Sequence, residues 1–486
     1  MNKPLLCLLL APLSAALAQQ PTPINLQPGA VITLPAGAAP SALAVADFNQ
    51  DGQADIAVCQ RGLNSVGVYL QASGVTFPNP AVGTYPAGTA PTGLVAVPLG
   101  HSASRPSIDL VAASGPSSSY TLLTNNNNGT GTFTPVSNGV SGNFLGYTVG
   151  AVSPQLLAYD LDSNGWADFV FTHDVPNVVY AGAYWERLMN STRLSSTGPQ
   201  TWARPGYLPS SVAISDFNRD GFVDVVQTNP RGHEFTVTLS APSASGPSWS
   251  IATNVQRLPS NGLRPVFVAT GDVNGDLLPD IALAHETSQE ITLFLNTRTT
   301  QFIAPAAYPL SGAPRQVLLK DLNNDNRTDM VVVTADGWLQ VFENSGSAGV
   351  SRYGTPIMLA AGVDPVALQL VDVDGDRRLD VVVGCAGDHT VRVFLNRSGT
   401  LASRPAQWAG VEVFPNPAHE RLTLQLPVSL RGPVTATLRD ALGRVVRQQA
   451  VAAPLATLSV ADLSPGVYAL QLSTAEGTMT QRVVVE

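Results

Sequence analysis

The sequence has little charge, few aromatic residues and almost no lysine. Charged residues make up 13% and aromatic residues 7% of its 486 residues, and its two lysines are Lys3 and Lys320. No glycine-rich motif supplies the lysine of a Walker phosphate loop, and Schiff-base chemistry would depend on Lys320 alone. The formal charge of −9 argues against the basic face that a nucleic-acid partner requires, so we expect no nucleic acid to bind.

Long apolar runs are missing after the N-terminal residues. Lys3 is followed by an apolar stretch from Leu5 to Leu17 and by the small-residue sequence Ala16-Leu17-Ala18, which is the order of a secretory signal peptide. This stretch is too short to span a bilayer, and no later run reaches the roughly 18 apolar residues that a membrane helix needs. We therefore predict a signal peptide at residues 1–18, export to the periplasm and no transmembrane segment.

Glycine and proline are abundant instead, with 42 and 38 copies, and such turn-rich composition is typical of an all-β protein. Within it one pattern recurs six times: Asp-x-Asn/Asp-x-Asp/Asn-x-x-x-Asp, followed by an apolar strand. The closing aspartates lie at positions 55, 168, 224, 280, 329 and 380, so the period is about 50 residues. The first interval is twice as long, and Asp109 closes a degenerate copy there whose loop, from Pro98 to Pro106, has lost its acids.

Seven units of this length predict a closed ring. Each unit has room for about four short strands, which make one β-propeller blade, and closure protects the sheet edges. A β-solenoid is the alternative, but its repeats are shorter. The expected fold class is all-β: a seven-bladed β-propeller over residues 25–400, a linker at 401–410 and a small C-terminal β-sandwich over residues 411–486.

The acidic loops predict calcium sites. Ca²⁺ takes six to eight oxygen ligands, and the side chains at positions one, three, five and nine of a loop can converge on one ion with the carbonyl group of position seven. Mg²⁺ demands stricter octahedral geometry, and Zn²⁺ prefers the His and Cys that these loops lack. A single loop of this composition would be interpreted as a turn, but six copies with one spacing favour about six structural Ca²⁺ ions. The candidate ligands are Asp47, Asn49, Asp51, Asp55, Asp160, Asp162, Asn164, Asp168, Asp216, Asn218, Asp220, Asp224, Asp272, Asn274, Asp276, Asp280, Asp321, Asn323, Asp325, Asp329, Asp372, Asp374, Asp376 and Asp380.

The sixth position divides the loops into two groups. The first three loops have glycine there, where a sharp turn favours a positive φ. The last three have Leu277, Asn326 and Arg377 instead. We expect distorted geometry in these three sites.

The loops and the strands that follow them resemble the FG-GAP/VCBS repeat family, whose relatives include the propellers of integrin α-subunits. The resemblance covers about residues 25–400. It implies a seven-bladed propeller with calcium in the blade loops and a role in adhesion or ligand binding. The second unit departs from the motif and is expected to bind no metal.

Two cysteines, Cys59 and Cys385, remain after the predicted signal peptide. They follow loop strands in the first and last units, which ring closure would make neighbours. An oxidising compartment permits a disulfide between them. Their offsets from the closing aspartate differ, which favours two buried free thiols, and the sequence leaves both alternatives open.

The last 76 residues follow another pattern. An opening Phe414-Pro415-Asn416-Pro417, a turn at Asp440–Arg444 and a strand preceded by Leu463-Ser-Pro-Gly466 closely resemble the type A sorting domain of the type IX secretion system. The resemblance implies the type IX machinery as a partner and passage through the outer membrane, with the domain removed and the protein released or anchored to surface polysaccharide. A generic β-sandwich accessory module is the alternative.

No catalytic motif accompanies these features. The six histidines form no His-Glu-x-x-His pair, no Gly-x-Ser-x-Gly elbow occurs, and most carboxylates belong to the loops. We expect a monomeric, secreted or cell-surface protein, at the outer membrane or outside the cell, that acts without catalysis as a binding or adhesion module for a glycan or protein. A polysaccharide-active enzyme and a purely structural envelope protein are the alternatives, because propellers host all three functions.

Overall fold

The structure, a computed structural model, divides into two compact units, Met1–Gly399 and Thr400–Glu486. It describes residues 23–99, 107–114, 119–135, 155–159, 168–172, 183–186, 200–201, 210–243, 246–248, 255–297, 301–347, 349–398, 411–415, 417–427, 434–440, 444–451, 454–474 and 477–486. The predicted signal peptide and linker lie outside these residues. No helix in the described part is long and apolar enough to cross a membrane, and the one helical segment there is a short 3₁₀ turn, Arg61–Leu63.

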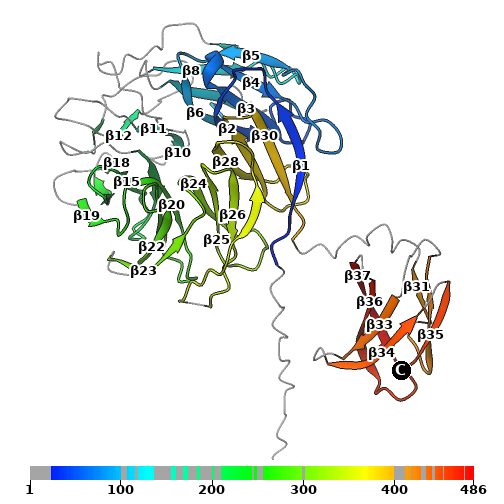
Figure 1. Ribbon diagram of the computed structural model, residues 1–486. Helices are drawn as coiled ribbons and strands as arrows, with labels where there is room; N and C mark the ends of the chain where they lie inside the picture. Colours follow the sequence, from blue (N-terminus) through cyan, green and yellow to red (C-terminus); the bar gives the residue numbers. More distant parts are fainter. Residues whose placement is uncertain are drawn as a thin grey trace, which may run out of the picture. The chain divides into compact units, whose positions relative to one another are not determined.

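The first unit contains seven four-stranded antiparallel sheets in its described residues, arranged around a centre in chain order (Figure 1). We number these sheets as blades. Blades 1 to 3 consist of β2 (Pro40–Ala46), β3 (Asp55–Gln60), β4 (Ser65–Tyr69) and β5 (Gly83–Pro86); of β6 (Pro91–Val97), β7 (Asp109–Ser114), β8 (Ser119–Asn125) and β9 (Phe133–Pro135); and of β10 (Leu156–Tyr159), β11 (Asp168–Thr172), β12 (Ala183–Glu186) and β13 (Gln200–Thr201).

The other four blades repeat the same order. Blade 4 also carries a separate hairpin of β17 (Ala241–Ser243) and β18 (Gly246–Ser248). Blades 4 to 7 consist of β14 (Val212–Ser215), β15 (Asp224–Asn229), β16 (Glu234–Thr238) and β19 (Val255–Pro259); of β20 (Pro265–Gly271), β21 (Asp280–His285), β22 (Glu290–Asn296) and β23 (Phe302–Pro309); of β24 (Pro314–Lys320), β25 (Asp329–Thr334), β26 (Trp338–Phe342) and β27 (Ile357–Ala360); and of β28 (Pro365–Val371), β29 (Asp380–Cys385), β30 (Thr390–Asn396) and β1 (Leu26–Thr33).

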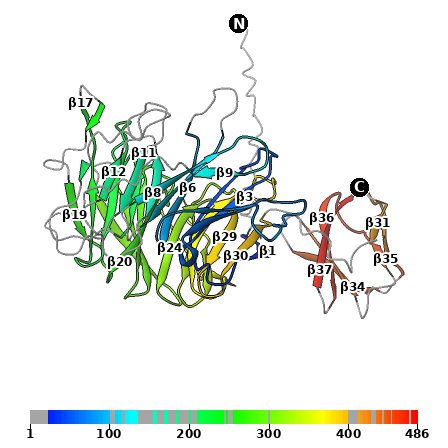
Figure 2. The same cartoon turned by 90° about the horizontal axis from the view of Figure 1, so that it is seen from above.

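The ring closes through the first strand of the chain. β1 pairs antiparallel with β30, with Ile32 opposite Val391, and both views show the two strands side by side (Figures 1 and 2). The innermost strands meet at the same place, where the Gln369 side-chain amide of blade 7 donates to the carbonyl oxygen of Leu43 in blade 1 at 3.2 Å. Blade 7 is thus assembled from both ends of the unit.

The core lies between blades. The second strand of blade 6, β25, is buried along its whole length. Val331 and Val333 face blade 7, whereas Met330 and Val332 pack with blade 5, because successive side chains of a strand point to opposite faces. Each hydrophobic cluster of the propeller in the described residues joins two neighbouring blades in this way.

Cys59 and Cys385 are free, buried thiols, so the ring is closed without a disulfide between them. They lie in different interblade clusters. The Cys385 thiol donates to the carbonyl oxygen of Ala361 at 2.9 Å, and burial raises its pKa to about 12. Both thiols therefore act as core side chains rather than as nucleophiles.

The second unit is a two-sheet sandwich. Its core is apolar and includes Leu424, Leu438 and Leu470, which are fully buried. One sheet pairs β31 (Glu412–Phe414), β32 (Arg421–Gln425) and β35 (Leu455–Ser459), and the other pairs β34 (Val445–Val451), β33 (Val434–Arg439), β36 (Gly466–Thr474) and β37 (Gly477–Val485).

Candidate calcium loops

The aspartate loops join the first and second strands of the blades. In each described loop the residue before the first aspartate pairs with the ninth-position aspartate, as Gly271 does with Asp280 and Val371 with Asp380. Shared register places the loops at the same end of their blades. Asp160, Asp162 and Asn164 lie outside the described residues, and Asp168 begins β11 opposite Tyr159.

The side chains at positions one, three and five fold inward around the backbone of their own loop. In the blade 5 loop, the two carboxylate oxygens of Asp272 accept the N–H groups of Asp276 at 3.2 Å and Leu277 at 2.7 Å. Asn274 Oδ1 accepts the same Asp276 N–H at 2.9 Å, and Asp276 accepts the N–H of Leu278 at 2.8 Å. The same four bonds occur in all five described loops.

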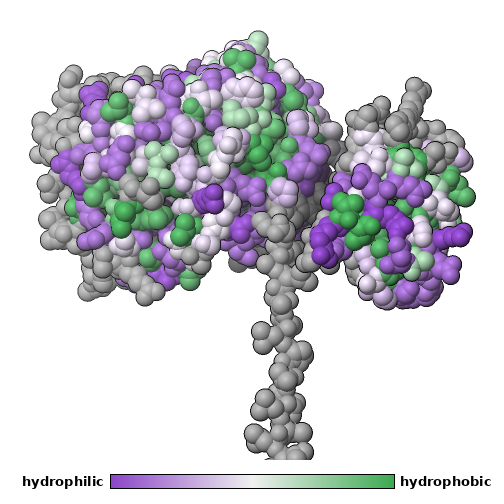
Figure 3. All heavy atoms as spheres, turned by 60° about the horizontal axis from the view of Figure 1, so that its bottom comes forward, coloured by the Kyte–Doolittle hydropathy of each residue, from purple (hydrophilic) through white to green (hydrophobic). Residues whose placement is uncertain are grey.

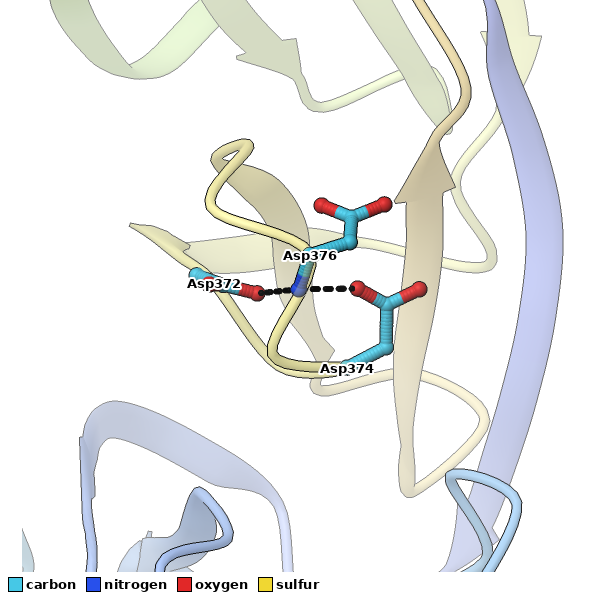
Figure 4. Close-up of side chains that lie close together, drawn as sticks. All are labelled: Asp372, Asp374 and Asp376. Atoms are coloured by element: carbon cyan, nitrogen blue, oxygen red, sulfur yellow. Dashed lines mark hydrogen bonds between the residues drawn. The ribbon is translucent and has the colours of Figure 1, made fainter. Parts of the chain in front are cut away.

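These bonds concentrate oxygen atoms in a small volume. Figure 4 shows the Asp376 N–H between the carboxylates of Asp372 and Asp374. Ligand oxygens of these three residues lie within 4.8 Å of one another. An all-oxygen donor set of this kind fits a hard cation such as Ca²⁺.

The sixth position is left-handed whether or not it is glycine. The φ angle is 86° at Gly52, and it is 70° at Leu277, 63° at Asn326 and 68° at Arg377. The distortion expected from the missing glycines is therefore wrong, because the last three loops keep both the conformation and the hydrogen bonds of the first. The left-handed conformation costs each non-glycine residue about 1 kcal/mol of backbone strain.

The ninth-position aspartates have a different role from the other three. Asp280 is fully buried, and its two oxygens accept the backbone N–H groups of Val273 at 2.9 Å and Asn296 at 2.8 Å. Both oxygens thus hold the loop base to the end of the third strand, whereas the sequence alone suggested a metal ligand. The other members of this group, with the same two kinds of bond, are Asp55, Asp224, Asp329 and Asp380.

Blade 2 separates the two roles. Its loop has no acids at the first three ligand positions, yet Asp109 remains, fully buried, and accepts the N–H of Asn125 at 2.8 Å. An aspartate that persists without its metal-binding neighbours is explained by the backbone bond. We call these buried ninth-position residues the clamp aspartates.

Burial raises the pKa of the clamp aspartates. It reaches about 7 for Asp280 and Asp329 and about 6 for Asp55, Asp224 and Asp380. The two backbone N–H donors oppose the rise, and the neighbouring loop carboxylates add to it. A cation bound by those carboxylates would lower the pKa of each clamp.

An asparagine that the sequence analysis missed links neighbouring loops. Asn296, at the end of the third strand of blade 5, gives its N–H to Asp280 and its side-chain amide to the carbonyl oxygen of Phe217 in blade 4 at 2.8 Å. Phe217 in turn gives its N–H to the clamp aspartate of blade 4. The equivalent amide donors are Asn125 to Phe48, Asn344 to Val273 and Asn396 to Leu322. A hydrophobic residue two positions before each asparagine, as in Phe394-Leu-Asn396, was the available signal.

Arginines neutralise part of the last two loops. Arg327 pairs with Asp325 at 2.5 Å. In blade 7, Arg378 pairs with Asp376, and Arg397 pairs with both Asp374 and Asp376. No such pair occurs in the described loops at 47–55, 216–224 and 272–280, so those three present their carboxylates without a competing guanidinium.

The ring of four-stranded blades with an aspartate loop after the first strand defines a β-propeller. Its loops match the model of the FG-GAP-like repeat at residues 272–332 and 321–383, and the second unit matches the secretion system C-terminal sorting domain at residues 412–486. The chain therefore carries FG-GAP-like repeats and a sorting domain, as predicted. The sorting domain implies interaction with the type IX secretion machinery and export to the cell surface or beyond it.

Individual relatives are distant. The KICSTOR complex protein ITFG2 of Mus musculus is 27% identical over 161 residues, which are 31% of this chain and 35% of that protein. The chain thus spans about a third of the length of this curated relative. Among solved structures, Saccharomyces cerevisiae Sqt1 aligns with 76% of this chain and 99% of its own at 9% identity and a TM-score of 0.50. The Dos1 propeller aligns with 76% of this chain and 95% of its own at 10% identity and a TM-score of 0.45. These likenesses concern the fold alone.

The clamp is tested by Asp280→Asn in calcium-free buffer. An amide has one acceptor oxygen, so either Val273 or Asn296 loses its buried partner, and we expect a loss of about 1–3 kcal/mol in the free energy of unfolding. Urea denaturation measures it. Asp276→Asn, in the exposed part of the same loop, is the control and should cost under about 0.5 kcal/mol. Equal losses in both variants would contradict the clamp.

The clamp pKa values also predict a pH dependence. Because burial raises the pKa of Asp280 and Asp329 from 3.8 to about 7, the folded protein binds more protons than the unfolded chain between these values. Their contribution to stability is fully present below the unfolded pKa and is lost as the pH rises through about 7. Calcium-free protein should therefore unfold at lower urea concentration at pH 7.5 than at pH 5. A higher midpoint at pH 7.5 would refute this assignment.

Proposed function

We propose that the protein is a secreted or cell-surface binding module without catalytic activity, with calcium in its blade loops. The observation that carries the calcium assignment is the recurrence of one oxygen-rich loop geometry in all five described copies. Ligands would come from positions one, three and five and from the carbonyl group of position seven. The FG-GAP-like repeats support this, since such repeats often bind calcium.

Calcium would act on stability. Each loop places carboxylates close together above a buried clamp aspartate, and a divalent ion would offset their repulsion at both positions. At the weak affinity typical of extracellular modules, each site contributes about 1 kcal/mol. This is a structural role, and it leaves the ligand-binding surface elsewhere on the propeller.

The binding role follows from the architecture and the sorting domain. A chain exported to the cell surface meets glycans and proteins there, and we propose one of these as its ligand. On the face drawn in Figure 3, hydrophobic residues lie in groups among hydrophilic ones. Exposed large apolar side chains among the described residues lie in turns, such as Leu63 and Leu263, and on strands, such as Ile303, Trp338 and Met358.

Calcium stabilisation is tested by thermal unfolding. Protein freed of metal by chelation should gain several degrees in Tm when Ca²⁺ is restored at roughly 5 mM, about five times the weakest dissociation constants typical of extracellular modules. Mg²⁺ at the same concentration should give a smaller shift, because the loops offer no rigid octahedral cage. An unchanged Tm on adding Ca²⁺ would contradict the structural role.

The arginine-paired loop provides an internal check. Replacing both Arg378 and Arg397 by Gln removes two cations from the blade 7 carboxylates, so calorimetric titration should show that its calcium affinity rises by about tenfold. Arg257→Gln, which removes an arginine paired with Glu234 on an outer strand, is the matched control and should leave every binding step unchanged.

The binding role is tested with the full-length protein on a glycan array and in pull-downs of surface proteins, beside an activity screen on polysaccharides. We expect saturable binding to at least one ligand and no turnover. Turnover of a polysaccharide in the absence of stoichiometric binding would favour the enzymatic alternative.

A further inference from the structure

A cavity of about 850 Å³ opens at the end of the propeller opposite the aspartate loops. Its wall is formed by the first residues of the innermost strands, such as Ser41, Gln316 and Val366, whereas the loops follow the last residues of these strands. The innermost strands are 7 residues long in blades 1, 2, 5, 6 and 7. The two ends are therefore about 20 Å apart, roughly twice the screening length at physiological ionic strength.

Arginines dominate the charge at this cavity. Among the described residues, the charged ones that line it are Arg61, Arg231, Arg264, Arg315, Glu286 and Asp364, four cations and two anions with a net charge of +2, in a chain whose formal charge is −9. The arginines come from blades 1, 4, 5 and 6, so they are spread around the ring. The ring explains this placement, because the turn after the second strand, which holds Arg61 and Arg231, and the start of the first strand, near Arg264 and Arg315, lie at the same end of the blades.

Two of these arginines are already paired and two are not. Arg264 contacts Glu286 at 2.8 Å, and Arg315 contacts Asp364 at 3.1 Å. Arg61 and Arg231 are exposed, and neither has an ion-pair partner among the described residues. In the part of the cavity that the structure describes, both acids are thus neutralised, and the guanidinium groups of Arg61 and Arg231 are available to a ligand.

The wall favours recognition by charge. Apart from the six charged residues, about half of the described lining consists of small or polar side chains and about half of proline and larger apolar ones, with Phe267 as the one aromatic residue in the described part. An aromatic platform for stacking uncharged sugar rings is therefore lacking. Guanidinium groups bind carboxylate and sulfate groups through paired N–H donors. The recessed shape admits a narrow, flexible chain and excludes the flat surface of a folded protein.

We propose that this arginine-lined cavity binds an acidic polysaccharide through its carboxylate or sulfate groups, with Arg61 and Arg231 as the principal contacts. This inference rests on the proposed binding function and specifies its ligand class. The separation from the aspartate loops lets the two ends act independently, with cations held at one and polyanions at the other.

The test is calorimetric titration of the full-length, calcium-loaded protein with polygalacturonate, which carries carboxylates, and with dextran sulfate. Neutral dextran is the uncharged control, and polyglutamate represents an acidic peptide. We expect at least one acidic polysaccharide to bind, with affinity that falls as salt rises, and neutral dextran not to bind.

The variant Arg61→Gln with Arg231→Gln should weaken that binding at least tenfold without changing Tm, because both side chains are exposed. Arg257→Gln again serves as the matched control and should bind like the unaltered protein. Equal binding by the double variant, or by neutral dextran, would overturn the proposal, as would binding of polyglutamate alone.

The outcome also separates this inference from the proposed function. A glycan or protein ligand found in the array or pull-down whose binding survives the double substitution would sustain the binding role and refute the cavity as its site. Failure to bind any ligand in either experiment would refute both.

Discussion

The propeller depends on one buried interaction, a carboxylate that holds two backbone N–H groups from separate parts of a blade. Asp280 fixes the base of the loop at Val273 and the end of the third strand at Asn296. The asparagine carries the connection into the preceding blade, so adjacent blades are joined by hydrogen bonds as well as by apolar packing. A buried acceptor that satisfies two backbone donors is costly to lose and strongly specifies register.

The fold could be predicted from the spacing of the loops. The different roles of the loop aspartates, as candidate metal ligands or as buried clamps, could not. Regular intervals between the closing aspartates predicted seven units, and an asparagine or aspartate at every second position predicted inward-facing oxygens. Position in the chain does not reveal whether a carboxylate faces the loop or the backbone beneath it. That distinction depends on burial, which separates the fully buried Asp280 from the exposed Asp276.

Long-range partners were equally hidden. Arg397, the residue after the third strand of blade 7, pairs with Asp374 of the loop. The motif Asp372-Val-Asp374-Gly-Asp376 does not predict this contact. The absence of glycine at Arg377 led to the wrong expectation of a distorted loop, because the Asp372 carboxylate accepts the N–H of Arg377 and holds that residue left-handed. The arginines of the cavity come from turns and, for Arg315, from the start of strand β24; they share no motif, and the ring brings them together.

The pairing of β1 with β30 joins the two ends of the propeller's sequence. These two strands are separated by nearly the whole sequence of the propeller. The loop-closure entropy for their contact is therefore large, and we expect them to pair last. Until β1 pairs with β30, blade 7 lacks its outer strand, and the edge of β30 stays open to other chains. For an exported protein this makes the propeller a ring that only an intact chain can complete: a chain cut short before Thr390 would leave β1 without its partner, and such products would be prone to aggregate or to be degraded.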